Sequence, residues 1–214
     1  MAIIDGETKK FVEDLFQKNL SGDVNLIFFS DDNCETCKDV EQLLGELSAI
    51  NSKIKLTRYD SKKNAKEAKF LGVDKFPATV IGGKKIYNAY YLGMPSGYEF
   101  SALLEDIVDA SNGTTKLSEE TKKAARGITQ NVDIKVFVTP TCPYCPRAVR
   151  MAHQLAMEND RIKGVMVESM EFQEMANQYD VMAVPKIVIN DKSSFEGALP
   201  ENAFMAEIMK ALKN

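Results

Sequence analysis

The four cysteines of this chain form two C-x-x-C pairs that lie in a repeated frame. Cys34-Glu35-Thr36-Cys37 and Cys142-Pro143-Tyr144-Cys145 are 108 positions apart, counted from residue 34 to residue 142. A proline follows the second cysteine of each pair by 40 positions, at Pro77 and at Pro185. Each proline opens an apolar, β-branched run, which is typical of a strand. Chance does not readily duplicate such a frame, so the sequence predicts two similar units whose chemistry is dithiol–disulfide exchange.

Length and composition agree with two globular units. A chain of 214 residues suits two domains of about 100 residues each, and we place them at residues 1–115 and 116–214. A hydrophobic content of 44% and a charged content of 27% are ordinary for globular proteins. The polar segment 111–115 reads as the linker. Because it is short, we expect the two units to pack together.

Charge and hydropathy argue against several kinds of partner and location. The formal net charge of −4 gives no electrostatic case for nucleic acid or an anionic membrane as partner. The first residues turn acidic at once and contain no apolar core of a signal peptide. No apolar run approaches the ~20 residues that a membrane helix needs. We therefore expect a cytoplasmic protein, and in that compartment C-x-x-C pairs are usually catalytic or metal-binding.

Both halves predict the same order of elements. Each begins with a helix and a buried strand, followed by a helix that starts at or near the cysteines and a second strand. A short polar helix, the proline-led strand, a turn and a closing helix complete the unit. In the first half these stretches lie at 11–20, 25–29, 37–50, 54–59, the strand after Pro77, the turn 82–85, and 100–108. In the second they lie after the N-cap Ser118, at 134–138, from 142 onward, at 165–168, after Pro185, at the turn 190–192, and at 204–212. The order predicts an α/β fold.

This order, with a C-x-x-C opening a helix and a proline before a hairpin, resembles the thioredoxin fold. Residues 136–146, 148–153 and 181–186 look closely like the C-terminal unit of the archaeal and thermophilic glutaredoxin-like protein disulfide oxidoreductases. That family has two tandem thioredoxin folds with one C-x-x-C each, so the resemblance covers the whole chain. It implies two tandem thioredoxin-fold units, each a central mixed sheet flanked by helices. The first unit matches more loosely, because Glu35 stands where glutaredoxins usually carry proline.

The chemistry explains why two cysteines stand at this spacing. Exchange needs a thiolate that attacks a disulfide and a second thiol that resolves the mixed disulfide. Two intervening residues at the start of a helix bring the sulfurs within bonding reach, and the helix N-terminus favours the thiolate. The sequence therefore predicts Cys34 and Cys142 as nucleophiles, with Cys37 and Cys145 resolving. The redox-active disulfides themselves would be the cofactor, with no other group bound.

The resemblance implies further roles. In thioredoxin folds the proline before the third strand is cis and faces the cysteines, which points to Phe76-Pro77 and Val184-Pro185. The backbone of these loops would hydrogen-bond an extended peptide of a protein disulfide substrate. The chain carries no G-x-G-x-x-G motif for a nucleotide, so its electrons would come from a partner. The resemblance suggests a flavin-dependent thioredoxin reductase for that part.

Several residues have a second interpretation. The two C-x-x-C pairs would form a zinc site only if folding brought them together, since zinc pairs usually lie within about 15–20 residues; we expect no metal. Asp60 and Glu168 each precede their proline by 17 positions. They are either solvated or proton acceptors for the resolving cysteine. His153, the only histidine, is expected at the surface or packed in its helix, and Met182 is a candidate to line a substrate groove.

Two other functions are compatible with the sequence. One is a thiol electron relay between a flavoprotein reductase and a peroxidase, like the N-terminal segment of alkyl hydroperoxide reductase flavoproteins. That segment also has tandem thioredoxin folds but typically keeps only one C-x-x-C, whereas this chain has two intact pairs. The other is a peptide-binding chaperone whose thiols are incidental.

Overall fold

The computed structural model of the chain describes residues 2–213. The first half has, in order, α1 (Gly6–Asn19), β1 (Val24–Ser30), α2 (Cys37–Ile50), β2 (Ile54–Asp60), α3 (Ala65–Phe70), β3 (Ala78–Gly82), β4 (Ile86–Leu92) and α4 (Glu99–Asn112). The second half repeats this order with α5 (Glu119–Arg126), β5 (Val132–Val138), α6 (Cys145–Glu158), β6 (Ile162–Glu168), α7 (Gln173–Gln178), β7 (Lys186–Ile189), β8 (Ser193–Glu196) and α8 (Glu201–Ala211). The repeat that the cysteine and proline frame predicts is therefore present in the structure.

Local sequence signals mark several element boundaries. The Asp5 side chain accepts hydrogen bonds from the amides of Glu7 and Thr8 at the start of α1, as N-cap residues do. Ser118 caps α5 in the same way by accepting a bond from the Thr121 amide, as expected. The turn between β7 and β8 contains Asn190 and Asp191 with φ of 52° and 56°. Asparagine and aspartate tolerate this left-handed backbone better than most residues.

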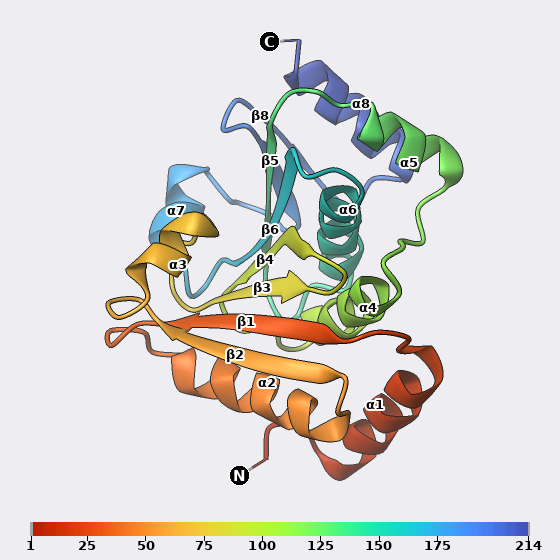
Figure 1. Cartoon of the computed structure of the whole chain (residues 1–214). Helices are drawn as coiled ribbons and strands as arrows, with labels where there is room; N and C mark the ends of the chain where they lie inside the picture. The colour runs from red at the N-terminus through yellow and green to blue at the C-terminus, as the bar shows by residue number, and fades with distance from the viewer. Residues whose placement is uncertain (1, 214) are drawn as a thin grey trace.

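The strands form one mixed sheet in the order β2-β1-β3-β4-β6-β5-β7-β8. Within each half the first two strands pair in parallel and the others antiparallel. The two halves join where β4 pairs in parallel with β6, from Ala89 opposite Gly164 to Leu92 opposite Val167. Figure 1 shows the strands running as one continuous layer from β2 to β8. The expected packing of the two units is thus confirmed, and the contact is a strand pair.

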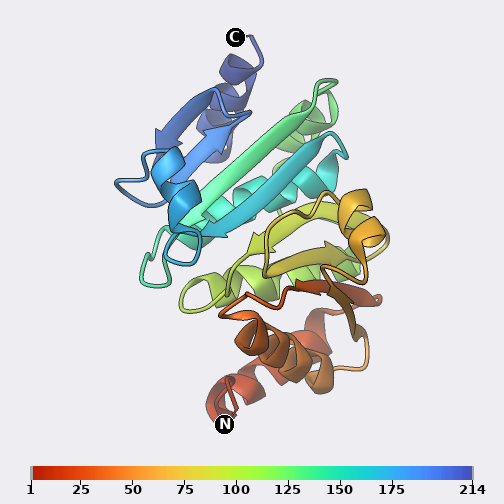
Figure 2. The ribbon, with the colours of Figure 1, turned by 90° about the vertical axis from the view of Figure 1, so that its left-hand side faces the viewer.

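Helices cover both faces of the sheet. The long helices α2, α4, α6 and α8 contribute their buried apolar side chains to the larger core cluster on one face. The short helices α3 and α7 cover the smaller cluster on the other face, through Ala68 and Ala176. Figures 1 and 2 show α3 and α7 on the same side of the sheet, one from each half. The face with α3 and α7 is therefore thinly covered.

The segment expected to be the linker is partly helical. Helix α4 continues through Ser111 and Asn112 and ends at Gly113, whose φ is 65°. Ser111 is buried, and its hydroxyl donates to the Gly22 carbonyl while accepting from the Gly22 amide. These bonds hold the last turn of the helix against the first half. The connection between α4 and α5 therefore runs over residues 113–118, slightly later in the chain than the expected linker.

A network of buried charged side chains lies where α4 meets α6. Arg150 of α6 forms ion pairs with Asp106 and Asp109 of α4, and all three side chains are buried. His153 is fully buried, with Nδ1 2.6 Å from an Asp106 carboxylate oxygen and Nε2 3.1 Å from the Tyr90 carbonyl. The Tyr91 hydroxyl also donates to Asp106. Asp106 thus contacts Arg150, His153 and Tyr91 at once, and it links the two helices through side chains that are all buried.

No helix among residues 2–213 is long and apolar enough to cross a membrane.

Candidate active site

The first C-x-x-C pair lies between β1 and α2. Cys34 and Cys37 are joined as a disulfide with their Cα atoms 5.5 Å apart. The Cys34 amide donates to the Asp31 carbonyl at 3.2 Å, which folds the loop that follows β1. Cys37, the first residue of α2, is buried, whereas Cys34 is partly exposed. A substrate can therefore reach the sulfur of Cys34 more readily than that of Cys37.

The second pair repeats this arrangement between β5 and α6. Cys142 and Cys145 form a disulfide with the same Cα separation of 5.5 Å. Cys145 is the first residue of α6 and is fully buried, and Pro146 follows in the first turn, where a proline is tolerated. Cys142 is 7% exposed. In both pairs the cysteine predicted to attack is the more exposed one.

Both sites sit at the start of a long helix. The sequence places the cysteines at the helix N-terminus, and α2 and α6 each span 14 residues from the second cysteine onward. The unpaired amides and the dipole of such a terminus favour a thiolate on the preceding cysteine. Because the thiolate is the species that attacks a disulfide, this position suits the nucleophilic cysteine of each pair.

The two predicted proline loops lie beside the cysteines. The Phe76–Pro77 and Val184–Pro185 peptide bonds are both cis. The Cys142 sulfur lies 3.6 Å from the Val184 carbonyl oxygen, and Phe76 and Pro77 line the same groove as Cys34. The cis geometry and the placement beside the cysteines agree with the resemblance. Substrate binding by these loops stays a prediction.

The two acids at equivalent sequence positions have different environments. Asp60 is half-buried at the end of β2, where its carboxylate accepts bonds from the Lys63 and Lys62 amides. These bonds lower the pKa of Asp60, the Lys63 amide most. Glu168 is buried, and burial raises the pKa of its carboxyl group. One Glu168 oxygen accepts from the Glu171 amide at 2.7 Å, and the other has no partner among residues 2–213. Of these two acids, only Glu168 has a raised pKa, and that of Asp60 is lowered.

A further buried acid, Glu99, lies close enough to Glu168 to feel its charge and was not predicted from the sequence. It is 1% exposed at the start of α4, and neither carboxylate oxygen has a partner within the described chain. Burial first, and then the nearby charge of Glu168, raise the pKa of Glu99 to about 7. A glutamate in the first turn of a helix is normally solvated and favourable to the dipole, so no sequence signal distinguishes this one.

The start of α4 is held against the loop that leads to Cys142. The Tyr98 amide donates to the Pro140 carbonyl at 3.1 Å. Gly97 has a φ of 59°, and a Cβ there would lie 2.2 Å from the Pro140 carbonyl oxygen. Only glycine permits this approach without a shift of the backbone. A residue of the first half, Glu99, is thus brought toward the second site.

A groove of about 660 Å³ opens at the first disulfide and is lined by both halves of the chain. The first half supplies the cysteine loop and the proline loop, and the second half supplies residues around α7. Glu171 crosses the boundary: its carboxylate accepts from the Thr36 hydroxyl and, at 2.6 Å, from the Met94 amide. The lining residues are Asn33, Cys34, Glu35, Thr36, Lys75, Phe76, Pro77, Met170, Glu171, Phe172, Gln173, Glu174, Met175 and Gln178.

Comparison with known proteins agrees with this geometry. The family model described as a thioredoxin domain matches residues 132–210. The chain is 39% identical to a thioredoxin of Methanocaldococcus jannaschii over 82 residues, which cover 38% of this chain and 96% of that protein. A crystal structure of a protein disulfide oxidoreductase from Aeropyrum pernix superimposes with a TM-score of 0.93 at 27% identity, covering 100% of this chain and 95% of the other.

Longer redox proteins also match. The chain is 22% identical to one component of the alkyl hydroperoxide reductase of Escherichia coli over 193 residues, which cover 90% of this chain and 35% of that protein. The chain spans about a third of the length of this and similar curated relatives. The Aeropyrum pernix structure, by contrast, matches over nearly its whole length. The chain belongs to the thioredoxin family, as a protein of two tandem thioredoxin folds that each carry a C-x-x-C disulfide.

Proposed function

We propose that the chain is a protein disulfide oxidoreductase that exchanges dithiols and disulfides with other proteins at both C-x-x-C pairs. The observation that carries this proposal is the repeated site geometry. Each disulfide precedes a 14-residue helix, exposes its first cysteine more than its second, and has a proline loop beside it. A disulfide that only stabilised the fold would need neither a more exposed first cysteine nor a proline loop beside it.

Reduction of a substrate proceeds in two steps at either site. The thiolate of Cys34 or Cys142 attacks one sulfur of the substrate disulfide, which forms a mixed disulfide and releases the other substrate sulfur as a thiolate. The second cysteine, Cys37 or Cys145, then attacks the first and releases the remaining substrate thiolate. The pair ends oxidised by two electrons and the substrate ends reduced by two. Oxidation of a substrate is the reverse sequence.

The resolving cysteine must lose a proton before it attacks. At the second site we assign this proton to the buried acids Glu99 and Glu168, because burial raises the pKa of both carboxyl groups. Asp60, whose pKa is lowered by backbone amides, is the weaker candidate at the first site. The backbone of Phe76 and Val184, next to Pro77 and Pro185, is proposed to pair with an extended substrate segment.

The two electrons have to be supplied by a partner protein. We propose a flavin-dependent thioredoxin reductase for this part, and a cytoplasmic setting for both proteins. The division into units at residues 1–115 and 116–214 also stays a proposal, supported by the repeated strand order in the two halves.

Insulin reduction with dithiothreitol tests the enzyme against the chaperone alternative. We expect wild type to accelerate insulin reduction and the Cys34→Ser, Cys142→Ser double variant to lose that acceleration. Unchanged turnover in the double variant would favour a chaperone whose thiols are incidental.

A thiol relay is the second candidate, and the similarity to the alkyl hydroperoxide reductase component over 90% of the chain favours it. A relay would pass electrons from a flavoprotein to a peroxidase faster than to insulin. Measuring NADPH or NADH oxidation in the presence of a reductase, with peroxidase or insulin as the acceptor, separates the two functions.

A further inference from the structure

We propose that the groove at Cys34–Cys37 selects substrate disulfides flanked by lysine or arginine, and that the second half of the chain supplies part of this selectivity through Glu171 and Glu174. The inference rests on the proposed exchange activity and names the class of substrate that the first site prefers. The groove is a substrate site because the partly exposed Cys34 opens into it. Its charge then determines which segments fit beside that sulfur.

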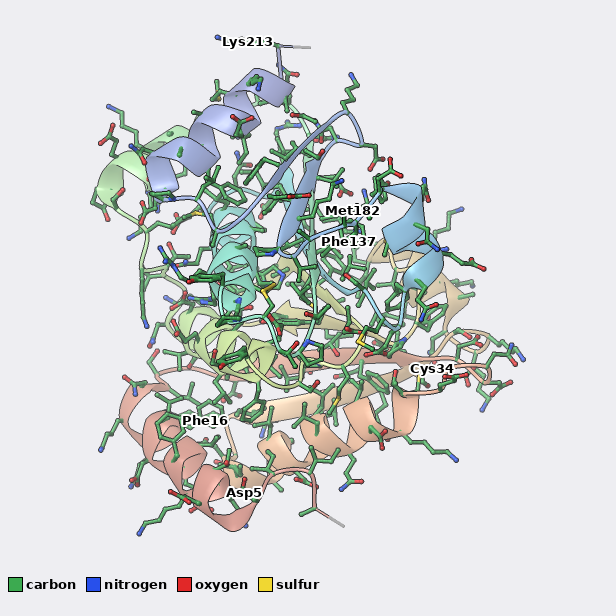
Figure 3. All side chains as sticks on the ribbon, turned by 180° about the vertical axis from the view of Figure 1, so that it is seen from behind. Asp5, Phe16, Cys34, Phe137, Met182 and Lys213 are labelled. Carbon is green, nitrogen blue, oxygen red and sulfur yellow. A yellow bond between two sulfur atoms is a disulfide. The ribbon has the colours of Figure 1, made fainter. Side chains whose placement is uncertain are left out.

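Residues from both halves of the chain line the groove. Figure 3 shows Cys34 on the side of the molecule where α7 lies, and residues 170–178 line the groove with the cysteine loop. Glu171 fixes this arrangement, since its two oxygens accept from Thr36, between the cysteines, and from the Met94 amide. A carboxylate from the second half is therefore held beside the first redox pair.

The charges in the groove are not neutralised within the molecule. It is lined by the carboxylates of Glu35, Glu171 and Glu174 and by one ammonium group, that of Lys75. Three negative groups against one positive group leave an excess of two negative charges. None of the four forms an ion pair with another described residue. Glu35 and Glu174 are exposed, so a substrate cation can reach them.

The second site has a different rim. The residues between its cysteines are Pro143 and Tyr144, and the Tyr144 side chain is 63% exposed. Met182, three residues before the cis proline, is 89% exposed and is labelled in Figure 3. Pro143, Tyr144 and Met182 carry no charge, in contrast to the carboxylates that line the first groove. The two C-x-x-C pairs thus differ in the charge of the residues around them, and the second pair serves as an internal control for the first.

The expected preference is moderate and depends on salt. Charges at an exposed groove act over a Debye length of about 10 Å at 0.1 M salt, and complementary charges mainly raise the rate of productive encounter. Two lysines beside the substrate disulfide would meet the excess of two negative charges, whereas two glutamates would be repelled. We expect kcat/KM to differ about fivefold to tenfold between such substrates at low salt.

The test uses full-length protein in which only the first pair is active, the Cys142→Ser, Cys145→Ser variant. Two fluorescently self-quenched peptide disulfides of the same length serve as substrates, one with two lysines beside the cysteine and one with two glutamates, and dithiothreitol supplies electrons. The lysine peptide should be reduced faster at 10 mM salt, and the ratio should fall toward one at 0.5 M salt. Glu174→Gln in this background should lower the ratio about threefold. Glu196→Gln, an exposed glutamate on β8 outside the groove, should leave the ratio unchanged.

The reciprocal variant Cys34→Ser, Cys37→Ser should show no preference for lysine. Equal rates for the two peptides at the first site, or faster reduction of the glutamate peptide, would overturn the inference while leaving the exchange activity intact. If neither peptide is reduced faster than by dithiothreitol alone in either variant, the proposed function itself fails.

Discussion

At the scale of single residues, the structure separates acids that look alike in the sequence. Asp60 and Glu168 hold equivalent positions, yet one accepts backbone amides at a turn and the other is buried with an unpartnered oxygen. Glu99 is buried in the same way, and no pattern in the sequence marks it. Burial of a side chain by a segment far away in the chain cannot be predicted from local spacing. The cysteines and prolines could be predicted, because the spacing between them can be read directly from the sequence and recurs in both halves.

Glu99 should make stability depend on pH. The pKa of Glu99 is raised from an ordinary 4.5 to about 7 in the folded chain. The unfolded chain therefore releases this proton more readily, and the free energy of unfolding falls as pH rises from 4.5 to about 7. Glu99→Gln should therefore gain stability relative to wild type over that range, by at most about 3 kcal/mol. Urea unfolding at pH 4.5 and pH 8 measures the difference. Glu120→Gln, an exposed first-turn glutamate of α5, is the control. A gap between Glu99→Gln and wild type that is constant with pH would contradict the assignment.

Glu35 should make the first pair the more reducing one. A carboxylate between the cysteines disfavours the Cys34 thiolate and hence the reduced state, with partial screening by solvent. Glu35→Gln should raise the first potential by tens of millivolts, where about 30 mV corresponds to ~1.4 kcal/mol, and leave the second unchanged. Glutathione equilibration of variants that keep a single pair measures both. The electrostatic argument is wrong if the first pair proves the more oxidising in wild type.

At the scale of elements, the sequence predicted most strands and helices but not the side-chain contacts between them. Apolar periodicity located the long helices, and the turn residues located both hairpins. The contact between α4 and α6 was not predicted, because nothing in the sequence marks Asp106 or Asp109, and His153 was expected at the surface or packed in its helix. In the structure these side chains are buried together with Arg150. Ion pairs between two helices cannot be predicted until the packing of those helices is known.

This network should be costly to break on one side. Asp106→Asn leaves Arg150 and His153 with one carboxylate fewer in a buried setting, and we expect a loss of about 3–5 kcal/mol in unfolding free energy. Glu105→Gln is the matched control, because Glu105 is on the same helix, lies 3.6 Å from Arg150 and is 48% exposed. That variant should lose less than about 1 kcal/mol. Comparable losses in the two variants, measured by urea unfolding, would show that burial does not matter here.

At the scale of the whole molecule, two similar units share one sheet but present unlike sites. The second pair has neutral Pro143 and Tyr144 between its cysteines, whereas the first pair opens into an acidic groove. The sequence predicted the duplication and the looser match of the first unit. It could not predict that Glu171 of the second half completes the first site, because the two segments are 135 residues apart.

The two pairs should therefore contribute unequally to activity on a general substrate. Insulin turnover should fall further in Cys142→Ser than in Cys34→Ser, because the second motif lacks an adjacent negative charge. Initial rates at equal protein and dithiothreitol concentrations measure this. An equal loss in both variants, or a larger loss in Cys34→Ser, would reject the division of labour.

The β4–β6 pair also determines what happens to half a chain. Cutting after residue 115 would leave Ala89–Leu92 as an open strand edge on one fragment and Gly164–Val167 as an open edge on the other. All eight of these residues are buried in the intact chain, and an exposed apolar edge recruits further strands. We expect each fragment alone to self-associate and an equimolar mixture to recover a single heterodimer, as judged by size-exclusion chromatography. In the intact chain, each half therefore covers the strand edge through which the other half would otherwise aggregate.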